Sequence, residues 1–241
     1  MMDAMSEPGS ATTRRAAGRR GPGRAPGRAA GAAGGRGDGR VIVRPYRRSD
    51  DAGLAAVCLA TADDGGDAGA LYASAGLVSD VYALPYVRFE PDLCLVVDDG
   101  TREGRVSGYV LGTSDTPAFE EWAARAWWPG VRARYPSAAA VPGSPDARLA
   151  AQVEQSRPTR RSLTDRYPAH LHVDLLPHVQ GQGIGRRLLE AFMAAADAAG
   201  AGGVHLGVND TNERAVDFCG RLGFHLVERD DDTLLLGRTL P

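Results

Sequence analysis

A glycine-rich segment in the last third of the chain has the residue types that bind an anion. Its members are Gln180, Gly181, Gln182, Gly183, Ile184, Gly185 and Arg186. Glycines let successive backbone N–H groups approach an anion at the positive end of the helix that follows, and Arg186 adds positive charge. A Rossmann site instead needs Gly-x-Gly-x-x-Gly and an acidic residue ending the next strand, where this chain has Val208 and Asn209. The segment therefore predicts a phosphate or pyrophosphate clamp and argues against a nicotinamide or flavin site.

Three residues that could transfer protons precede this segment. His170, His172 and Asp174 alternate, so a strand there would direct all three side chains to one face. Asp174 and His172 are candidate general bases, and an imidazole has the ordinary pKa closer to neutrality, about 6.5. The alternative is a structural Asp–His network. The trio also resembles the His-x-His-x-Asp start of a metallo-hydrolase, but Leu175 stands where a further His belongs, so no metal site is predicted.

Alternating strands and helices are expected to position these groups. Predicted strands cover Val41–Val43, Leu93–Asp98, Val106–Thr113, Leu171–Leu176, Val204–Val208 and Leu234–Leu236. Predicted helices include a stretch from Leu71 to Tyr82, one from Asp146, and Gly183–Ala199 and Asn212–Leu222. This order predicts an α/β fold in which a central mixed sheet is flanked by helices.

The composition of the 241-residue chain excludes several function classes. All 28 basic residues are arginine, so a Walker-type phosphate loop, a pyridoxal Schiff base and a kinase-type nucleotide lysine each lack the required ammonium group. Cys58, Cys94 and Cys219 are far apart, which argues against a disulfide framework or a zinc knuckle and favours a reducing, cytoplasmic setting. Because no apolar run approaches the ~18–20 residues of a membrane helix, no membrane partner is expected.

The first forty residues differ from the rest of the chain. Residues 1–40 are rich in Gly, Ala and Arg and contain no aromatic residue, Leu, Ile or Val, so they predict a disordered tail. Its eight arginines against three acidic residues could attract nucleic acid, but nothing else in the sequence supports such a partner. Residues 41–241 are predicted to form one domain, with residues 114–168 as an insertion.

Several motifs together resemble one known family, the GNAT acyltransferases. They are Gln180-x-x-Gly183-x-Gly185, Leu175-Leu176-Pro177, Asn212-x-x-Ala215, Leu222-Gly223-Phe224 and Val43-Arg44-Pro45-Tyr46. The first is similar to the acetyl-coenzyme A signature of that family, and the others match the ends of its strands and helices. The resemblance spans about Val41 to Leu240. Within the family, residues 81–86, 89–91, 108–112, 127–129 and 170–174 resemble bacterial acetyltransferases related to the C-terminal domain of O-GlcNAcase.

The resemblance implies acetyl-CoA as acyl donor and a particular way of holding it. The fourth and fifth strands would splay apart, and the pantetheine arm would pair with backbone near Leu175 and Leu176. The pyrophosphate would lie on the N–H groups of Gln182 through Arg186. Asn212 would contact the pantetheine or the coenzyme tail, and it is also an ordinary helix N-cap candidate.

For catalysis, the resemblance implies a strand carboxylate as base and a tyrosine as acid. Asp174 is then the first candidate base and His172 the second. The expected tyrosine is replaced by Cys219, whose thiol could donate a proton or contact the cofactor, or simply pack in the core. This departure leaves a second reading open, namely a catalytically weak domain that binds acetyl-CoA as a sensor or interaction module.

The acceptor is expected to be an amine, in a small molecule or a peptide, bound beneath residues 114–168. Asp115 could attract its positive charge, and Tyr82 and Trp127 could form walls of its site. Such aromatics are also common in cores. The sequence does not identify the amine, and it is compatible with a monomer or a homodimer.

Overall fold

One twisted sheet organises the part of the chain that the computed structural model describes, residues 40–101 and 105–241. The tail predicted for residues 1–40 lies, apart from Arg40, outside these residues. The strands are β1 (Ile42–Pro45), β2 (Leu95–Asp98), β3 (Val106–Thr113), β4 (Ala169–Leu175), β5 (Gly203–Asn209), β6 (His225–Asp230) and β7 (Thr233–Thr239). Their order is β1-β2-β3-β4-β5-β7-β6, and only β4 and β5 are parallel neighbours. The predicted mixed sheet is thus confirmed.

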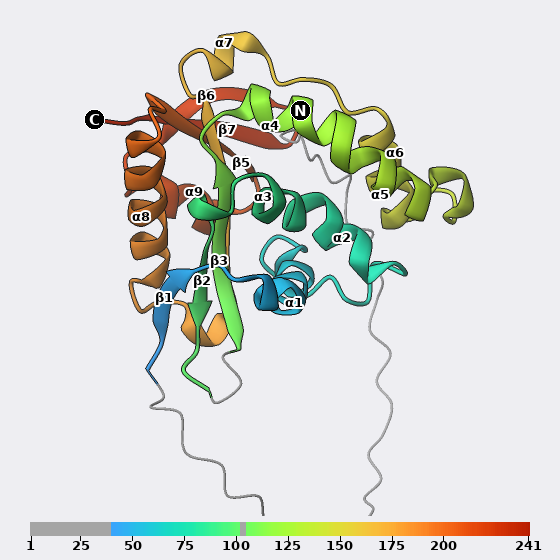
Figure 1. Cartoon of the computed structure of the whole chain (residues 1–241), viewed down its shortest axis with the longest axis horizontal. Helices are drawn as coiled ribbons and strands as arrows, with labels where there is room; N and C mark the ends of the chain where they lie inside the picture. Colours follow the sequence, from blue (N-terminus) through green and yellow to red (C-terminus); the bar gives the residue numbers. More distant parts are fainter. Residues whose placement is uncertain (1–39, 102–104) are drawn as a thin grey trace, which may run out of the picture.

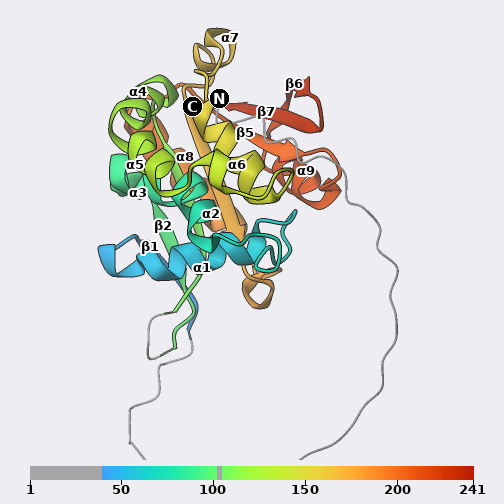
Figure 2. The same cartoon turned by 90° about the vertical axis from the view of Figure 1, so that its right-hand side faces the viewer.

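Helices cover both faces of this sheet (Figures 1 and 2). They are α1 (Asp51–Thr61), α2 (Ala75–Tyr82), α3 (Leu84–Phe89), α4 (Thr116–Trp122), α5 (Trp128–Arg134), α6 (Pro145–Glu154), α7 (Arg161–Thr164), α8 (Ile184–Ala198) and α9 (Glu213–Gly220). The amphipathic α8 packs on one face, where Leu188 and Phe192 are fully buried, and α1 to α3 pack on the other. No helix among these is long and apolar enough to cross a bilayer.

The parallel strands β4 and β5 pair over a short distance only. Their register joins Ala169 to Val204 and His170 to His205, and both strands then continue without pairing to each other. β3 holds β4 along its whole length, and the N–H of Leu176 still donates to the Ser107 carbonyl at 2.9 Å. The splay of the two strands, expected from the family resemblance, is therefore confirmed.

Period-two alternation gives the two faces of β4 different characters. Leu171 and Val173 pack into the core under α8, whereas His170, His172 and Asp174 point to the face covered by α1 and α2. The three candidate proton-transfer side chains therefore lie on the face opposite to α8, the helix that follows the glycine-rich segment.

Residues 114–168 form mainly helices on the α1–α3 face. Phe119 of α4, Trp128 and Val131 of α5, and Leu149 of α6 are buried in a cluster shared with α1, α2 and α3. In Figure 2, α4, α5 and α6 lie in front of the sheet on this side. The helix predicted from Asp146 is present as α6.

Two element predictions need correction. The helical stretch predicted from Leu71 begins only at Ala75, and Pro85 at the start of α3 separates a further helix. Strand β6 was not predicted, because it is an edge strand whose charged, largely exposed side chains give no clear apolar alternation.

Gly112 on β3 packs too closely against its neighbours to carry a side chain. A Cβ there would overlap the His170 carbonyl oxygen and lie 2.6 Å from the Phe192 ring. We expect Gly112→Ala to lower the free energy of unfolding by about 2–3 kcal/mol, since strand or ring must shift. In the matched control, Gly130→Ala in α5, nothing lies within 4 Å of the added Cβ, so we expect no loss and a gain of up to ~1 kcal/mol. Urea unfolding measures both, and equal stability of the two variants would contradict the prediction.

Candidate active site

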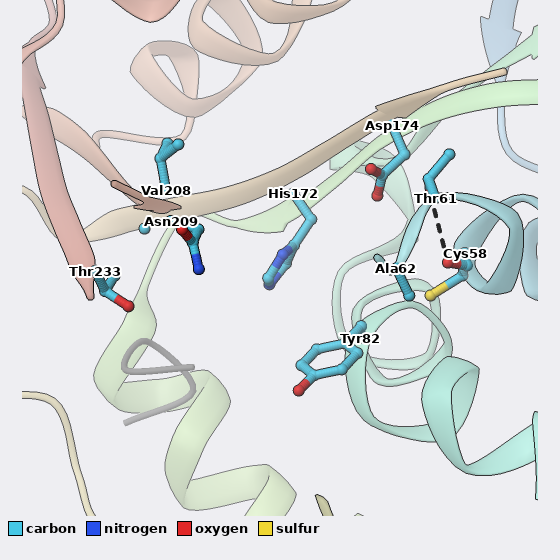
Figure 3. A pocket seen from close by; sticks show the side chains of 10 residues that line it. Cys58, Thr61, Ala62, Tyr82, His172, Asp174, Val208, Asn209 and Thr233 are labelled. Atoms are coloured by element: carbon cyan, nitrogen blue, oxygen red, sulfur yellow. Dashed lines mark hydrogen bonds between the residues drawn. The ribbon is translucent and has the colours of Figure 1, made fainter. Parts of the chain in front are cut away.

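A cavity of about 200 Å³ opens where β4 and β5 diverge (Figure 3). Its walls come from five elements, α1, α2, β4, β5 and β7. The lining residues are Cys58, Thr61, Ala62, Tyr82, His172, Asp174, Gly207, Val208, Asn209 and Thr233. Two of the predicted proton-transfer residues and one predicted substrate-binding residue, Tyr82, are thus brought together. The cavity lies on the face that α1 and α2 cover.

Asp174 lies in an environment that disfavours its charged form. Burial raises the pKa of this carboxyl above 3.8, while interactions with the hydroxyls of Tyr109 and Thr61 partly offset that rise. Tyr109 stands directly opposite Asp174 on β3 and is fully buried, and its hydroxyl approaches the carboxyl without reaching hydrogen-bond geometry. A carboxyl with a raised pKa is a stronger base than an exposed one, which suits it to take a proton near neutral pH.

His172 is held by a chain of hydrogen bonds that reaches α4. The Thr116 hydroxyl donates to the Pro168 carbonyl at 2.6 Å, so it accepts from His170 Nδ1 at 2.7 Å. With His170 neutral, its Nε2 accepts from the Tyr86 hydroxyl at 2.9 Å. The Tyr86 oxygen can then only accept from His172 Nε2, 3.0 Å away. This direction of donors makes Nδ1 the nitrogen that carries the lone pair in a neutral His172.

The same chain of hydrogen bonds engages the His170 side chain. His170 is 4% exposed and both of its ring nitrogens are engaged, by Tyr86 and by Thr116. Hydrogen bonds therefore join the two histidines of this strand through Tyr86, and these bonds include no aspartate, unlike the Asp–His network given above as the alternative. Within residues 40–101 and 105–241, no three His, Cys, Asp or Glu side chains are grouped to hold a metal ion.

The glycine-rich segment forms the turn from β4 into α8. Gly181 and Gly183 both have φ of +74°, which favours glycine, and no atom lies within 4 Å of a Cβ built on either. No side chain caps α8, so the N–H groups of Ile184, Gly185 and Arg186 point away from the helix without helical acceptors. Gln180 anchors the segment by donating to the Leu175 carbonyl at 2.7 Å. The turn is a cradle of backbone donors of the kind that binds phosphate.

Two other predicted cofactor residues lie on α9. Asn212 is the N-cap of this helix and accepts from the Ala215 N–H at 3.1 Å. Cys219 is 3% exposed, lies among apolar core residues and does not line the cavity. Burial raises the pKa of its thiol to about 11. Proton donation from such a thiol to an ordinary thiolate, with a pKa of about 8.5, is uphill by about 3 kcal/mol.

Asp115 and Trp127 have their polar atoms engaged outside the cavity. Asp115 is the N-cap of α4 and accepts from the Ala118 N–H at 3.0 Å. The Trp127 indole N–H donates to the Asp80 carbonyl at 2.7 Å. Their predicted contacts with an acceptor stay untested predictions, whereas Tyr82 does face the cavity.

Four polar or thiol groups of the cavity wall were not predicted from the sequence. Cys58 and Thr61 come from α1, Asn209 ends β5, and Thr233 begins β7. No pattern in the sequence places α1, which carries Cys58, beside β4. Thr233 joins the site only through its register with Asn209.

Comparisons with known proteins agree with this geometry. The model of the acetyltransferase (GNAT) family matches residues 153–224, which include β4, the glycine-rich segment and α9. The crystal structure of SsHAT has a TM-score of 0.76 and 41% sequence identity, covering 83% of this chain and 98% of that one. The chain therefore belongs to the GNAT family, and it is an N-acetyltransferase of that family.

Two further matches are more distant and support narrower conclusions. Protein O-GlcNAcase of Rattus norvegicus is 23% identical over 205 residues, 82% of this chain, which spans only 22% of that relative's length. This match agrees with the resemblance to acetyltransferases related to O-GlcNAcase. PH1933 from Pyrococcus horikoshii OT3, with 12% identity and a TM-score of 0.54 over 84% of this chain and 99% of that chain, shares the fold alone.

The three cysteines are free and buried, which predicts a simple labelling result. Burial raises the pKa of Cys58 and Cys94 to about 12 and that of Cys219 to about 11, and the thiolate is the reactive form. We expect an aromatic disulfide reagent at pH 8 to label none of them in the folded protein within minutes, and all three in denaturant. Rapid labelling that disappears in Cys219→Ala would show instead that Cys219 is open to solvent.

Proposed function

We propose that the protein uses acetyl-CoA to acetylate an amine by direct attack of the amine on the thioester. The observation that carries this proposal is the cavity at the divergence of β4 and β5, lined by Asp174 and His172. The glycine-rich turn opens on the other side of β4. Donor and acceptor would therefore approach the gap from different sides, so both could be bound at once, as a ternary complex requires.

Residues of the turn fit the coenzyme in three ways. Gly181 and Gly183 leave open space, the N-terminus of α8 supplies N–H donors, and Arg186 and Arg187 add positive charge that favours a pyrophosphate. Directly after β4, the N–H of Leu176 pairs with β3, so by alternation Val173 and Leu175 direct their backbone groups toward β5. Beyond His170 these groups have no partner in β5, and the Leu175 carbonyl accepts from Gln180. The backbone groups of Val173 and the N–H of Leu175 could therefore pair with an extended pantetheine arm.

When bound, acetyl-CoA supplies the electrophilic carbonyl and the thiolate leaving group. The chain must then deliver a neutral amine, whose ordinary pKa of about 10 keeps it protonated near pH 7. Asp174 would accept the proton that the ammonium form loses before attack, and the proton that the nitrogen loses after its bond to the carbonyl forms would pass to the leaving thiolate or to solvent. His172, held by Tyr86, would present Nδ1 as a second acceptor that orients the amine. Cys219, a residue of α9, would contact the bound coenzyme.

The three cysteines bear on the compartment in which the protein would work. Three free cysteines suit a reducing compartment, and we infer a cytoplasmic protein, monomeric or homodimeric. The cavity wall offers one carboxylate and, among its described residues, no arginine, so the proposed acceptor is cationic or neutral before reaction. It could be a small molecule or the amine of a peptide.

The role of Asp174 predicts a change in rate and in pH dependence. We expect Asp174→Asn to lower kcat by about 10²–10³, measured as free thiol released from acetyl-CoA with a panel of amines. In the wild type, kcat/KM should fall as the pH falls through the raised pKa of Asp174, above 3.8, because a protonated carboxyl accepts no proton. That fall should be absent in Asp174→Asn.

Two controls separate the explanations. Asp197→Asn removes an exposed carboxyl on α8 and should behave as the wild type. Acetyl-CoA should raise the melting temperature of all three proteins, because none of these substitutions changes the glycine-rich turn. If the acid fall in rate disappears in His172→Phe and persists in Asp174→Asn, His172 is the base.

The second candidate function is an acetyl-CoA-binding domain with little catalysis. It is favoured by Cys219, a poor acid where the family resemblance leads us to expect a tyrosine. Under the proposed enzyme function, Cys219→Ala should keep turnover within about threefold, because a thiol with a pKa of about 11 protonates a thiolate poorly. An inactive wild type that gains thiol release in Cys219→Tyr, with a melting curve showing a folded variant, would favour the binding function.

A further inference from the structure

The end of the cavity formed by β5 and β7 contains a buried hydroxyl without a partner. Thr233 is 4% exposed, and its Oγ1 makes no hydrogen bond with any residue in the described part of the chain. Leaving such a group unpaired costs about 1–3 kcal/mol. Because Thr233 also lines the cavity, a ligand in the cavity could supply the missing bond.

Asn209 lies beside this hydroxyl and presents a donor. The two residues are cross-strand partners in the β5–β7 register. The Asn209 Oδ1 accepts from the N–H of Thr211 at 2.9 Å and from its hydroxyl at 2.6 Å, so the orientation of the amide is fixed. Figure 3 shows the amide nitrogen pointing into the cavity. Asn209 thus offers N–H groups, and Thr233 offers a hydroxyl that donates or accepts.

Both side chains lie on the face of the sheet that α1 and α2 cover, where the acceptor is proposed to bind. Their neighbours in the two strands, Val208 and Leu234, belong to the core under α8, and alternation sends Asn209 and Thr233 the other way. Figure 3 shows them at one end of the cavity, with Asp174 at the other end and His172 between. A molecule whose amine lies near Asp174 would therefore direct its remaining part toward Asn209 and Thr233.

We propose that Asn209 and Thr233 form a subsite for a neutral oxygen of the acceptor, a hydroxyl or a carbonyl located a few bonds from its amine. This inference rests on the proposed function for the identity of the occupant as the acceptor. A carboxylate fits less well, because none of the lining residues in the described chain is an arginine and Asp174 carries negative charge when ionised. A cavity of about 200 Å³ holds roughly six waters, which suits a small acceptor or the end of a larger one.

The subsite is tested with amines that differ by one oxygen. The probes are ethanolamine, 3-amino-1-propanol and 4-amino-1-butanol, each paired with the alkylamine in which a methyl replaces the hydroxyl, and β-alanine as a probe that carries a carboxylate. Binding to the full-length protein saturated with coenzyme A is measured by calorimetry, and turnover with acetyl-CoA is measured separately by thiol release.

We expect at least one amino alcohol to bind about tenfold more tightly than its alkylamine, which corresponds to one hydrogen bond. β-Alanine should bind more weakly than 3-amino-1-propanol. Thr233→Val removes the hydroxyl at nearly constant shape, and the preference should fall about tenfold, toward equality. Thr233→Ser should restore it. The matched control is Thr239→Val, at the far end of β7, which should keep the wild-type preference.

Each other outcome is decisive. Equal binding within every pair overturns the subsite, and so does an unchanged preference in Thr233→Val. If thiol is released in these experiments, the proposed function still stands. A preference for the hydroxyl without any turnover supports the subsite and overturns the proposed function. Weaker coenzyme A binding in Thr233→Val, with no change in amine preference, would assign the hydroxyl to the coenzyme and overturn the proposal.

Discussion

The early end of the β4–β5 pairing is the constraint on which the rest of the site depends. Two parallel strands paired over their full length would bury the backbone between them and leave no cavity. Here the pairing stops at His170, so the backbone groups that follow need other partners. β3 holds β4 to its end, and β7 holds β5 as far as Asn209. The sheet can therefore open in its middle without losing either strand.

This opening divides the chemistry between two faces. Leu171 and Val173 bind β4 to the core under α8, next to the turn that offers backbone N–H donors. His172 and Asp174 alternate with them and therefore lie in the cavity on the opposite face. One strand thus packs against the core with one set of side chains and directs the candidate proton-transfer groups into the cavity with the other set.

Features encoded by neighbouring residues could be predicted, and features created by distant contacts could not. The turn at Gly183 and the common face of His172 and Asp174 follow from local spacing, and the structure contains both. Thr233 reaches the cavity only through its register with Asn209, which no local pattern encodes. Trp127 has its indole N–H bonded to the Asp80 carbonyl, a partner distant in sequence. Such partners compete with ligands for a polar group, and only the folded chain reveals them.

The hydrogen-bond chain from Thr116 to His172 has a consequence for how acceptor choice can evolve. Thr116 is the first residue of α4, so the start of residues 114–168 helps to set which nitrogen of His172 holds the proton. The hydrogen bonds described above join residues of α3, α4 and β4, and none of those bonds comes from α5 or α6. If the acceptor binds in the cavity as proposed, mutations in α5 and α6 would change the surroundings of that site and leave these hydrogen bonds intact, whereas a mutation at Thr116 would disturb the bonds themselves. New specificities should therefore arise by divergence in the later part of the segment, while its first turn is kept under purifying selection.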